Sequence, residues 1–201
     1  FLLSEDVVFN EVFYKYGFED IELGYRLAKK GMQIYFFPEA VGEHYHPYHD
    51  IHKFCMRQEC AGEMALIFVN LHEEIESIVN VNAIKYKWSQ YFNGKDDFVQ
   101  NSIYNELITF CQFIEDNFET SHSDLSTYLS TVYRQLFRFA YEKGVYGSQI
   151  VDNSCNLNDV LRNEFLTKKI YNALRELNLR CNVTNYTKLM ELCISDLDQT
   201  P

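Results

Sequence analysis

The feature that most constrains the fold is a run of apolar residues at helical spacing, which begins near Lys53 and continues through most of the chain. The spacing predicts a long helix over 57–78 and three more helices over 103–118, 123–144 and 160–174, and a shorter fifth helix is expected over 186–194. We therefore expect residues 51–201 to form an α-helical, bundle-like domain. Its predicted core contains Phe68, Leu71, Leu107, Leu129, Leu136, Leu161 and Ile170.

Residues 1–50 show a different pattern. A helix is predicted over 19–30, because acidic residues occupy its first turn, lysines occupy its last turn and Gly31 follows. The β-prone run 33–37 ends at Pro38, so a strand is expected there, followed by a loop over 40–48. One face of the predicted helix carries small and apolar residues, with a glycine that would allow a neighbouring backbone to approach closely. These residues are Ile21, Gly24, Leu27 and Ala28.

Charge and composition exclude several classes of partner. The formal net charge of −11 argues against binding to nucleic acid or to anionic lipid, since both surfaces select clustered Lys and Arg. No apolar run approaches the roughly 18–20 residues that a transmembrane helix needs. The six cysteines show no C-x-x-C pair, which is typical of buried thiols in a reducing compartment. We therefore expect a cytoplasmic protein without a transmembrane segment.

Two adjacent acids and a histidine pair are the candidate chemical groups. Glu19 and Asp20 open the predicted helix, and His44 and His46 follow the predicted strand. Together these residue types can supply a general base and a ligand for a divalent metal. The acids could instead only stabilise the helix start, and the histidines could only be exposed on a loop. Alternate residues of an extended segment point to opposite sides, so one histidine ligand is favoured over two.

The same region carries a dense set of family motifs. They are Phe9-Asn-Glu-Val-Phe13, Tyr16-Gly-Phe-Glu-Asp-Ile-Glu-Leu-Gly-Tyr-Arg-Leu27, Lys30-Gly31, Phe37-Pro-Glu-Ala40 and His44-Tyr-His46. In order and spacing, residues 9–46 resemble the acceptor-side, C-terminal half of the catalytic domain of family 2 glycosyltransferases, which have the GT-A fold.

The resemblance implies a role for each candidate residue. Asp20 matches the catalytic base of the inverting members, and Glu19 is expected to bind or orient the acceptor. His44 or His46 matches the histidine near the metal and the donor diphosphate, with His44 favoured. The implied reaction transfers a sugar from a nucleotide-sugar donor to a carbohydrate or other hydroxyl acceptor, with Mn²⁺ or Mg²⁺ offsetting the charge of the leaving diphosphate.

The chain also departs from the family pattern, because no Asp-x-Asp motif precedes the acceptor segment. We therefore expect a C-terminal fragment of a longer transferase that is inactive by itself. The predicted fold is α+β and mostly α, with a GT-A remnant at 1–50 followed by the helical domain at 51–201. Two alternatives remain open. One is a helical protein-interaction module, in which the helical domain could also form a homo-oligomer. The other is a small metalloprotein that uses His44, His46, His49 and His52.

Overall fold

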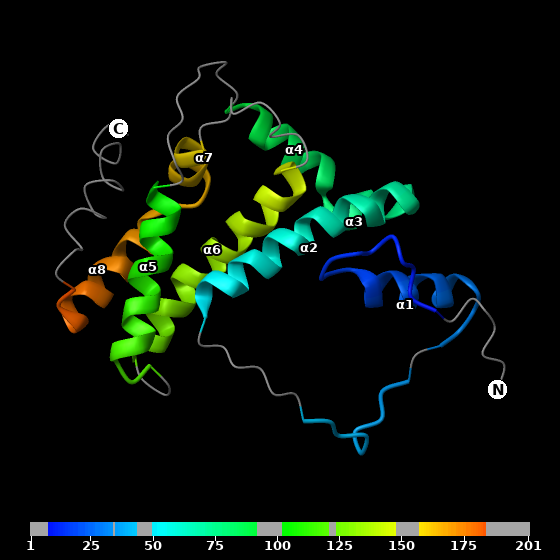
Figure 1. Ribbon diagram of the computed structural model, residues 1–201, viewed down its shortest axis with the longest axis horizontal. Helices are drawn as coiled ribbons and strands as arrows, with labels where there is room; N and C mark the ends of the chain where they lie inside the picture. The colour runs from blue at the N-terminus through cyan, green and yellow to red at the C-terminus, as the bar shows by residue number, and fades with distance from the viewer. Residues whose placement is uncertain are drawn as a thin grey trace.

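The computed structural model describes residues 8–33, 35–43, 50–91, 102–120, 124–147 and 157–183. The described part is mostly helical and contains no strand (Figure 1). In chain order the elements are α1 (Glu19–Lys29), α2 (Ile51–Leu71), the 3₁₀ turn η2 (Glu73–Ile75), α3 (Glu76–Val79), α4 (Val81–Ser89), α5 (Ser102–Asn117), α6 (Asp124–Gly147), α7 (Leu157–Glu164) and α8 (Lys168–Cys181). None of the described helices combines the length and the apolar character required to cross a bilayer.

The two longest helices, α2 and α6, lie side by side at the centre of the molecule (Figure 1). They approach closely because each carries a glycine at the contact. A Cβ atom added to Gly62 would lie 2.0 Å from the carbonyl oxygen of Tyr141, and one added to Gly144 would lie 1.9 Å from that of Glu59. Backbone therefore packs directly on backbone at this point, with no layer of side chains between the helices.

The larger of the two hydrophobic clusters joins α5, α7 and α8 to the α2–α6 pair. It includes Leu107, Leu129, Leu136, Leu161 and Ile170, each 2% exposed or less, which confirms these predicted core positions. Truncation of a buried leucine of this kind generally destabilises a protein by about 2–5 kcal/mol.

A buried carboxylate attaches α4 to α6. Glu142 is 4% exposed, and its oxygens accept hydrogen bonds from Trp88 Nε1 at 2.9 Å and from Arg138 Nε at 2.9 Å. The ammonium group of Lys87 also contacts Glu142. Two cationic donors and an indole N–H thus compensate for the removal of this carboxylate from water.

The smaller cluster fixes α1 and the residues before it to the C-terminal half of α2. Phe13, 9% exposed, packs with Met64 and Phe68 of α2, and Phe18 and Tyr25 cover the same side chains. The ring of Tyr25 meets that of Phe68 edge-on at a centroid distance of 5.9 Å. Side chains from both sides of residue 50 therefore share one cluster, and the two-domain division at that residue stays a prediction.

The expected strand over 33–37 is not found in the part of this segment that the structure describes, which omits residue 34. Phe36 is 89% exposed and Phe37 is 67% exposed. A strand requires a neighbour to accept and donate its backbone hydrogen bonds, and no other described segment supplies one here. The α/β character expected for residues 1–50 is therefore not confirmed.

The predicted helices over 103–118 and 123–144 are confirmed as α5 and α6, whereas the other helix boundaries needed correction. The chain turns after Leu71, so the helix predicted over 57–78 becomes α2, η2 and α3, and α4 follows as a separate helix. Leu71 is 44% exposed because it lies beside the buried face of α2 at the helix end, so its predicted burial was wrong. The helix predicted over 160–174 is split at Phe165, whose fully buried ring turns in toward Lys87 and Arg138. The helix predicted over 186–194 lies outside the described residues.

The predicted inward face of α1 was also wrong. Ile21 is 53% exposed and Ala28 is exposed, whereas Glu22 is the buried residue of this helix. A Cβ atom at Gly24 would meet nothing within 4 Å, so no neighbouring backbone lies close to it. The Glu22 carboxylate points inward, where Arg26 of the same helix and His72 at the end of α2 contact it.

Candidate functional site

The acid pair follows two residues with left-handed backbone. Gly17 has φ 116° and Phe18 has φ 67°, and α1 begins directly afterwards at Glu19. A Cβ atom on Gly17 would lie 2.7 Å from the Cα atom of Ala61 in α2. Glycine is therefore required both by the backbone conformation and by the close approach to α2. This turn determines where the first helical residues, Glu19 and Asp20, are placed.

The two acids have different environments. The Glu19 carboxylate accepts a hydrogen bond from the backbone N–H of Gly17 at 2.7 Å and is half-buried. Asp20 is exposed, and its carboxylate accepts a hydrogen bond from the backbone N–H of Ile21 at 2.8 Å. Glu19 thus holds the turn that begins the helix, while Asp20 presents a carboxylate to solvent at the positive end of the helix dipole.

Polar contacts fasten the residues before α1 to α2. The ammonium group of Lys15 pairs with the carboxylate of Glu63. The guanidinium of Arg57 lies 4.4 Å from the centroid of the Tyr16 ring, a cation–π contact. The acid pair is therefore carried by a segment that α2 holds at several successive positions.

A second set of contacts attaches the C-terminal half of α1 to η2. Glu74 of η2 accepts hydrogen bonds from the hydroxyl of Tyr25 at 2.6 Å and from the ammonium of Lys29 at 2.5 Å. These two bonds lower the pKa of Glu74 to about 2. The Glu74 carboxylate therefore stays ionised over the neutral and mildly acidic range and binds both partners there.

Glu22 is a functional candidate that sequence reasoning missed. It is 1% exposed, and its Oε1 atom lies 2.8 Å from Arg26 Nε and 3.2 Å from His72 Nε2 at the end of α2. Arg26 also donates to the carbonyl oxygen of Val8 at 2.6 Å. The i,i+4 spacing from Glu22 to Arg26 was visible in the sequence, but the contact with His72 joins positions 50 residues apart. Glu22 lies two positions after Asp20 and is bound by Arg26 and His72, so these contacts hold the start of α1 and its acid pair in place.

An apolar hollow of about 400 Å³ lies beside the acid pair. Its walls come from α1, from the ends of α2 and α6, and from the η2–α3 segment. The lining side chains are Phe18, Ile21, Tyr25, Phe68, Ile75, Ile78, Val79 and Tyr141. Phe18 and Ile21, which flank the acid pair in the sequence, both belong to this lining, whereas Glu19 and Asp20 do not.

The predicted metal ligands cannot be placed against the acids. His44 and His46 lie outside the described residues, as does His49. Among the residues that the structure describes, no three side chains of His, Cys, Asp or Glu come together as a metal would require. His52 is described and lies at the first turn of α2, on the wall of a different groove. The binding of Mn²⁺ or Mg²⁺ therefore stays a prediction.

The arrangement defines what this part of the chain can do. Asp20 is an exposed, helix-terminal carboxylate on a segment held by α2 and η2. Such a carboxylate can accept the proton of a hydroxyl group placed within about 2.6–3.2 Å of it. Glu19 is half-buried and one of its carboxylate oxygens accepts the backbone N–H of Gly17, so the two acids are suited to different tasks.

The class of protein that matches this segment is the glycosyltransferases. A family model described as the N-terminal domain of galactosyltransferase matches residues 9–50, which include Gly17, Glu19, Asp20 and Glu22. No curated protein and no solved structure matches the chain. The match supports a glycosyltransferase-related domain over these residues, in agreement with the class predicted from the motifs. Membership of family 2 and the C-terminal position within a catalytic domain stay predictions.

Proposed function

We propose that the chain is part of an enzyme that transfers a sugar from a nucleotide-sugar donor to a carbohydrate or other hydroxyl acceptor, with inversion at the anomeric carbon. In this proposal Asp20 removes the proton of the attacking hydroxyl, and Glu19 orients the acceptor while it holds the start of α1. A divalent cation, Mn²⁺ or Mg²⁺, would be bound with the help of His44 or His46 and would offset the charge of the leaving diphosphate.

The observation that carries the proposal is the exposed carboxylate of Asp20 at the N-terminus of α1, inside the segment that matches the galactosyltransferase family model. A base must be reachable by the acceptor and must be held in one place. Asp20 is exposed, and its helix is fixed through Glu22 to His72 and through Lys29 to Glu74. These contacts support a role in catalysis beyond a contribution to helix stability.

The decisive experiment replaces Asp20 by asparagine in the protein that contains this chain and measures the rate of sugar transfer. Asparagine keeps the shape of the side chain and can accept a hydrogen bond, but it cannot take up a proton. General-base assistance is worth about 10²–10⁴-fold, so transfer should fall at least about 100-fold, while the affinity for the donor should change little.

Asp124→Asn is the matched control. Asp124 is also an exposed aspartate in the first turn of a long helix, with a side chain that is 80% exposed. Both changes remove one negative charge from a helix start, and Asp124→Asn also weakens the contact with Arg180 of α8, so a stability effect alone should be at least as large in Asp124→Asn. An Asp20→Asn enzyme that keeps more than about a tenth of the wild-type transfer rate would rule out general-base catalysis by Asp20.

The proposed metal requires a separate test. Chelation of divalent cations should abolish transfer, and added Mn²⁺ or Mg²⁺ should restore it. His44→Ala should raise the metal concentration needed for half-maximal transfer more than His46→Ala does. Transfer that is insensitive to chelation would contradict this part of the proposal and leave the role of Asp20 standing.

A protein-interaction module is the second candidate function, and one observation favours it. Within the described residues of the segment that follows α1, Tyr35, Phe36, Phe37 and Val41 are between 67% and 89% exposed. Large exposed apolar side chains that lie close together in the sequence are typical of contact surfaces. The double variant Phe36→Ser/Phe37→Ser tests this reading by sedimentation and by capture of a partner. It should abolish association if these rings form the interface, and unchanged association would exclude that role.

A further inference from the structure

The apolar hollow of about 400 Å³ is lined by both buried and exposed side chains. Phe68 and Ile75 are 3% and 4% exposed, whereas Ile21 is 53% exposed and Ile78 is 78% exposed. The two exposed isoleucines belong to α1 and α3 (Figure 1). The chain therefore leaves large aliphatic side chains in water beside an apolar hollow, which is typical of a contact surface. We call it the α1–α3 hollow.

The lining offers few groups that could orient a small polar ligand. Its polar side-chain atoms are the hydroxyls of Tyr25 and Tyr141. The Tyr25 hydroxyl already donates to Glu74 at 2.6 Å. Pockets for small ligands and cofactors usually combine an apolar lining with several placed polar groups. The α1–α3 hollow is therefore better suited to apolar side chains of a protein than to a polar cofactor.

Acidic side chains outnumber basic ones in α1, η2 and α3, which supply most of this lining. The two bases of these elements are already paired, Arg26 with Glu22 and Lys29 with Glu74. The remaining four acids form no ion pair with any residue that the structure describes, and they are Glu19, Asp20, Glu73 and Glu76. These elements therefore carry negative charge that the described chain does not compensate.

The uncompensated carboxylates adjoin the hollow. Glu73 is exposed and lies two positions before Ile75, and Glu76 directly follows Ile75. Burial raises the pKa of Tyr141 to about 12, with smaller contributions from the charges of Glu142 and Glu76, so Glu76 lies near this wall of the hollow. Negative charge around an apolar surface complements a partner that brings Lys or Arg to its edge.

The same charges disfavour other occupants. A second copy of this chain would bring the same carboxylates to the contact, and its net charge of −11 would add to the repulsion. An anionic bilayer is disfavoured for the same reason. A neutral apolar molecule could enter the hollow, but it would gain nothing from the carboxylates around it.

We infer that the α1–α3 hollow docks a basic amphipathic helix of a partner protein, whose apolar side chains enter the hollow and whose Lys and Arg side chains pair with the surrounding carboxylates. Helices that bind in grooves use apolar anchors spaced three or four positions apart. A hollow of about 400 Å³ is large enough for more than one such side chain. The inference goes beyond the proposed transfer reaction and does not require it.

Fluorescence anisotropy of the full chain with labelled model peptides tests this inference. The probe contains two copies of the unit Leu-Lys-Lys-Leu-Leu-Lys-Leu, which is basic and has one apolar face as a helix. One comparison peptide has Glu in place of every Lys. A second comparison peptide alternates Leu and Lys, so that it is basic but has no apolar helix face.

Two variants test the apolar and the charged part of the contact, Ile78→Ser and Glu73→Gln. Both side chains are exposed, so the fold should be retained, and circular dichroism of each variant verifies this. The matched controls are Leu179→Ser in α8 and Glu39→Gln. Leu179 is 68% exposed, Glu39 is exposed, and neither lines the hollow.

The expected result is binding of the basic amphipathic peptide, weakened about tenfold by Ile78→Ser and about threefold by Glu73→Gln and unchanged by the two controls. The inference is overturned if this peptide does not bind at concentrations up to about 100 μM, or if either comparison peptide binds as tightly. It is also overturned if Ile78→Ser or Glu73→Gln binds like the wild type, or if the controls weaken binding equally.

The result is independent of the test of Asp20. Peptide binding is measured without sugar donor or acceptor, and neither Ile78 nor Glu73 has a role in the proposed reaction. Loss of transfer in Asp20→Asn without peptide binding would keep the transferase and refute the docking site. Peptide binding that depends on Ile78, with transfer unaffected by Asp20→Asn, would keep the docking site and refute the proposed base.

Discussion

The close contact of α2 with α6 gives the sharpest prediction about stability. Replacing Gly62 by alanine places a methyl group 2.0 Å from the carbonyl oxygen of Tyr141, and the same change at Gly144 places one 1.9 Å from that of Glu59. Carbon and oxygen atoms approach to about 3.3 Å, so the helices must separate locally by about 1.3 Å. The obstructing atoms belong to backbone, and no side-chain rotation can relieve the clash.

The magnitude follows from the loss of packing. A gap of about 0.5–1 Å already forfeits a quarter to a half of a van der Waals contact, and α2 and α6 share the most extensive helix contact in the described structure. Overpacking of this kind costs about 1–3 kcal/mol, and we expect each substitution to reach about 3 kcal/mol. For a chain of this size the thermal midpoint should fall by about 6–12 °C.

The assay is urea denaturation followed by circular dichroism, with Gly24→Ala as the control. Gly24 lies inside α1 and a Cβ atom there meets nothing within 4 Å, so alanine should raise the free energy of unfolding by about 0.5–1 kcal/mol. The double variant Gly62→Ala/Gly144→Ala should cost less than the two single variants added together, because one separation accommodates both methyl groups. Single variants within about 0.5 kcal/mol of the wild type would refute the backbone contact.

Three further predictions follow from single contacts. Leu107→Ala should lower the free energy of unfolding by about 2–5 kcal/mol, whereas Leu71→Ala should lower it by less than about 1 kcal/mol because Leu71 is 44% exposed. If urea denaturation shows equal losses of free energy for the two variants, the observed register of α2 and α5 is contradicted. The pKa of Glu74 is lowered to about 2, so its stabilising contribution is fully present above the ordinary glutamate pKa near 4.5 and is lost as the pH falls toward 2. Glu74→Gln should therefore flatten the fall in the free energy of unfolding over that pH range. An unchanged pH profile would show that the bond from Lys29 contributes nothing to stability. Burial raises the pKa of Cys55 to about 11, so iodoacetamide at pH 8 should leave Cys55 unmodified in the native protein. Mass spectrometry of digested peptides measures the modification, and rapid alkylation would mean that this part of the core opens.

The long helices could be predicted because their apolar residues repeat without interruption. Leu129 and Leu136 lie seven positions apart on α6, and both are buried as the spacing requires. The helix α4 could not be predicted in the same way. Its buried residues are Val81 and Trp88, and the contact of Lys87 with Glu142 joins positions 55 residues apart. Local periodicity carries no information about such a contact.

In the candidate site, too, some features could be predicted from the sequence and others could not. The start of α1 and the exposure of Asp20 were predictable, since acids in a first helical turn favour the dipole and usually face water. The burial of Glu22 was not, because it depends on His72 at the far end of α2. The strand expected near Phe36 illustrates the opposite error, in which β propensity is strong but the described structure offers no neighbouring strand.

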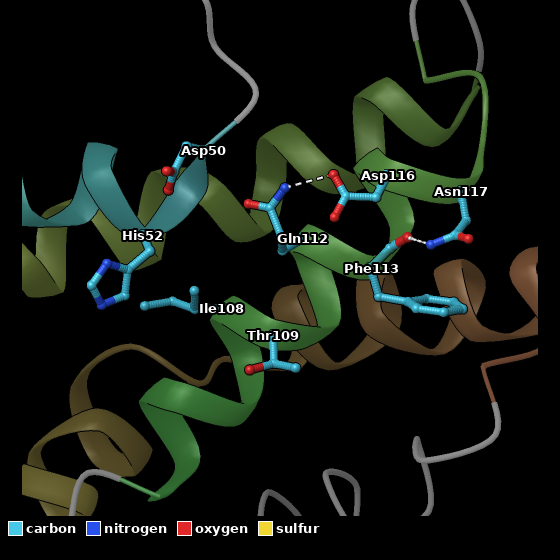
Figure 2. A pocket seen from close by; sticks show the side chains of 8 residues that line it. All are labelled: Asp50, His52, Ile108, Thr109, Gln112, Phe113, Asp116 and Asn117. Atoms are coloured by element: carbon cyan, nitrogen blue, oxygen red, sulfur yellow. Dashed lines mark hydrogen bonds between the residues drawn. The ribbon is translucent and has the colours of Figure 1, made fainter.

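The helix α2 also sets a distance between two surfaces. Its cap, Asp50, lies in the wall of a hollow of about 590 Å³ between the start of α2 and α5 (Figure 2), and Ala61 supports the turn that precedes the acid pair. Eleven helical positions correspond to about 16 Å along the axis of α2. A single molecule that contacts both surfaces must therefore span at least this length.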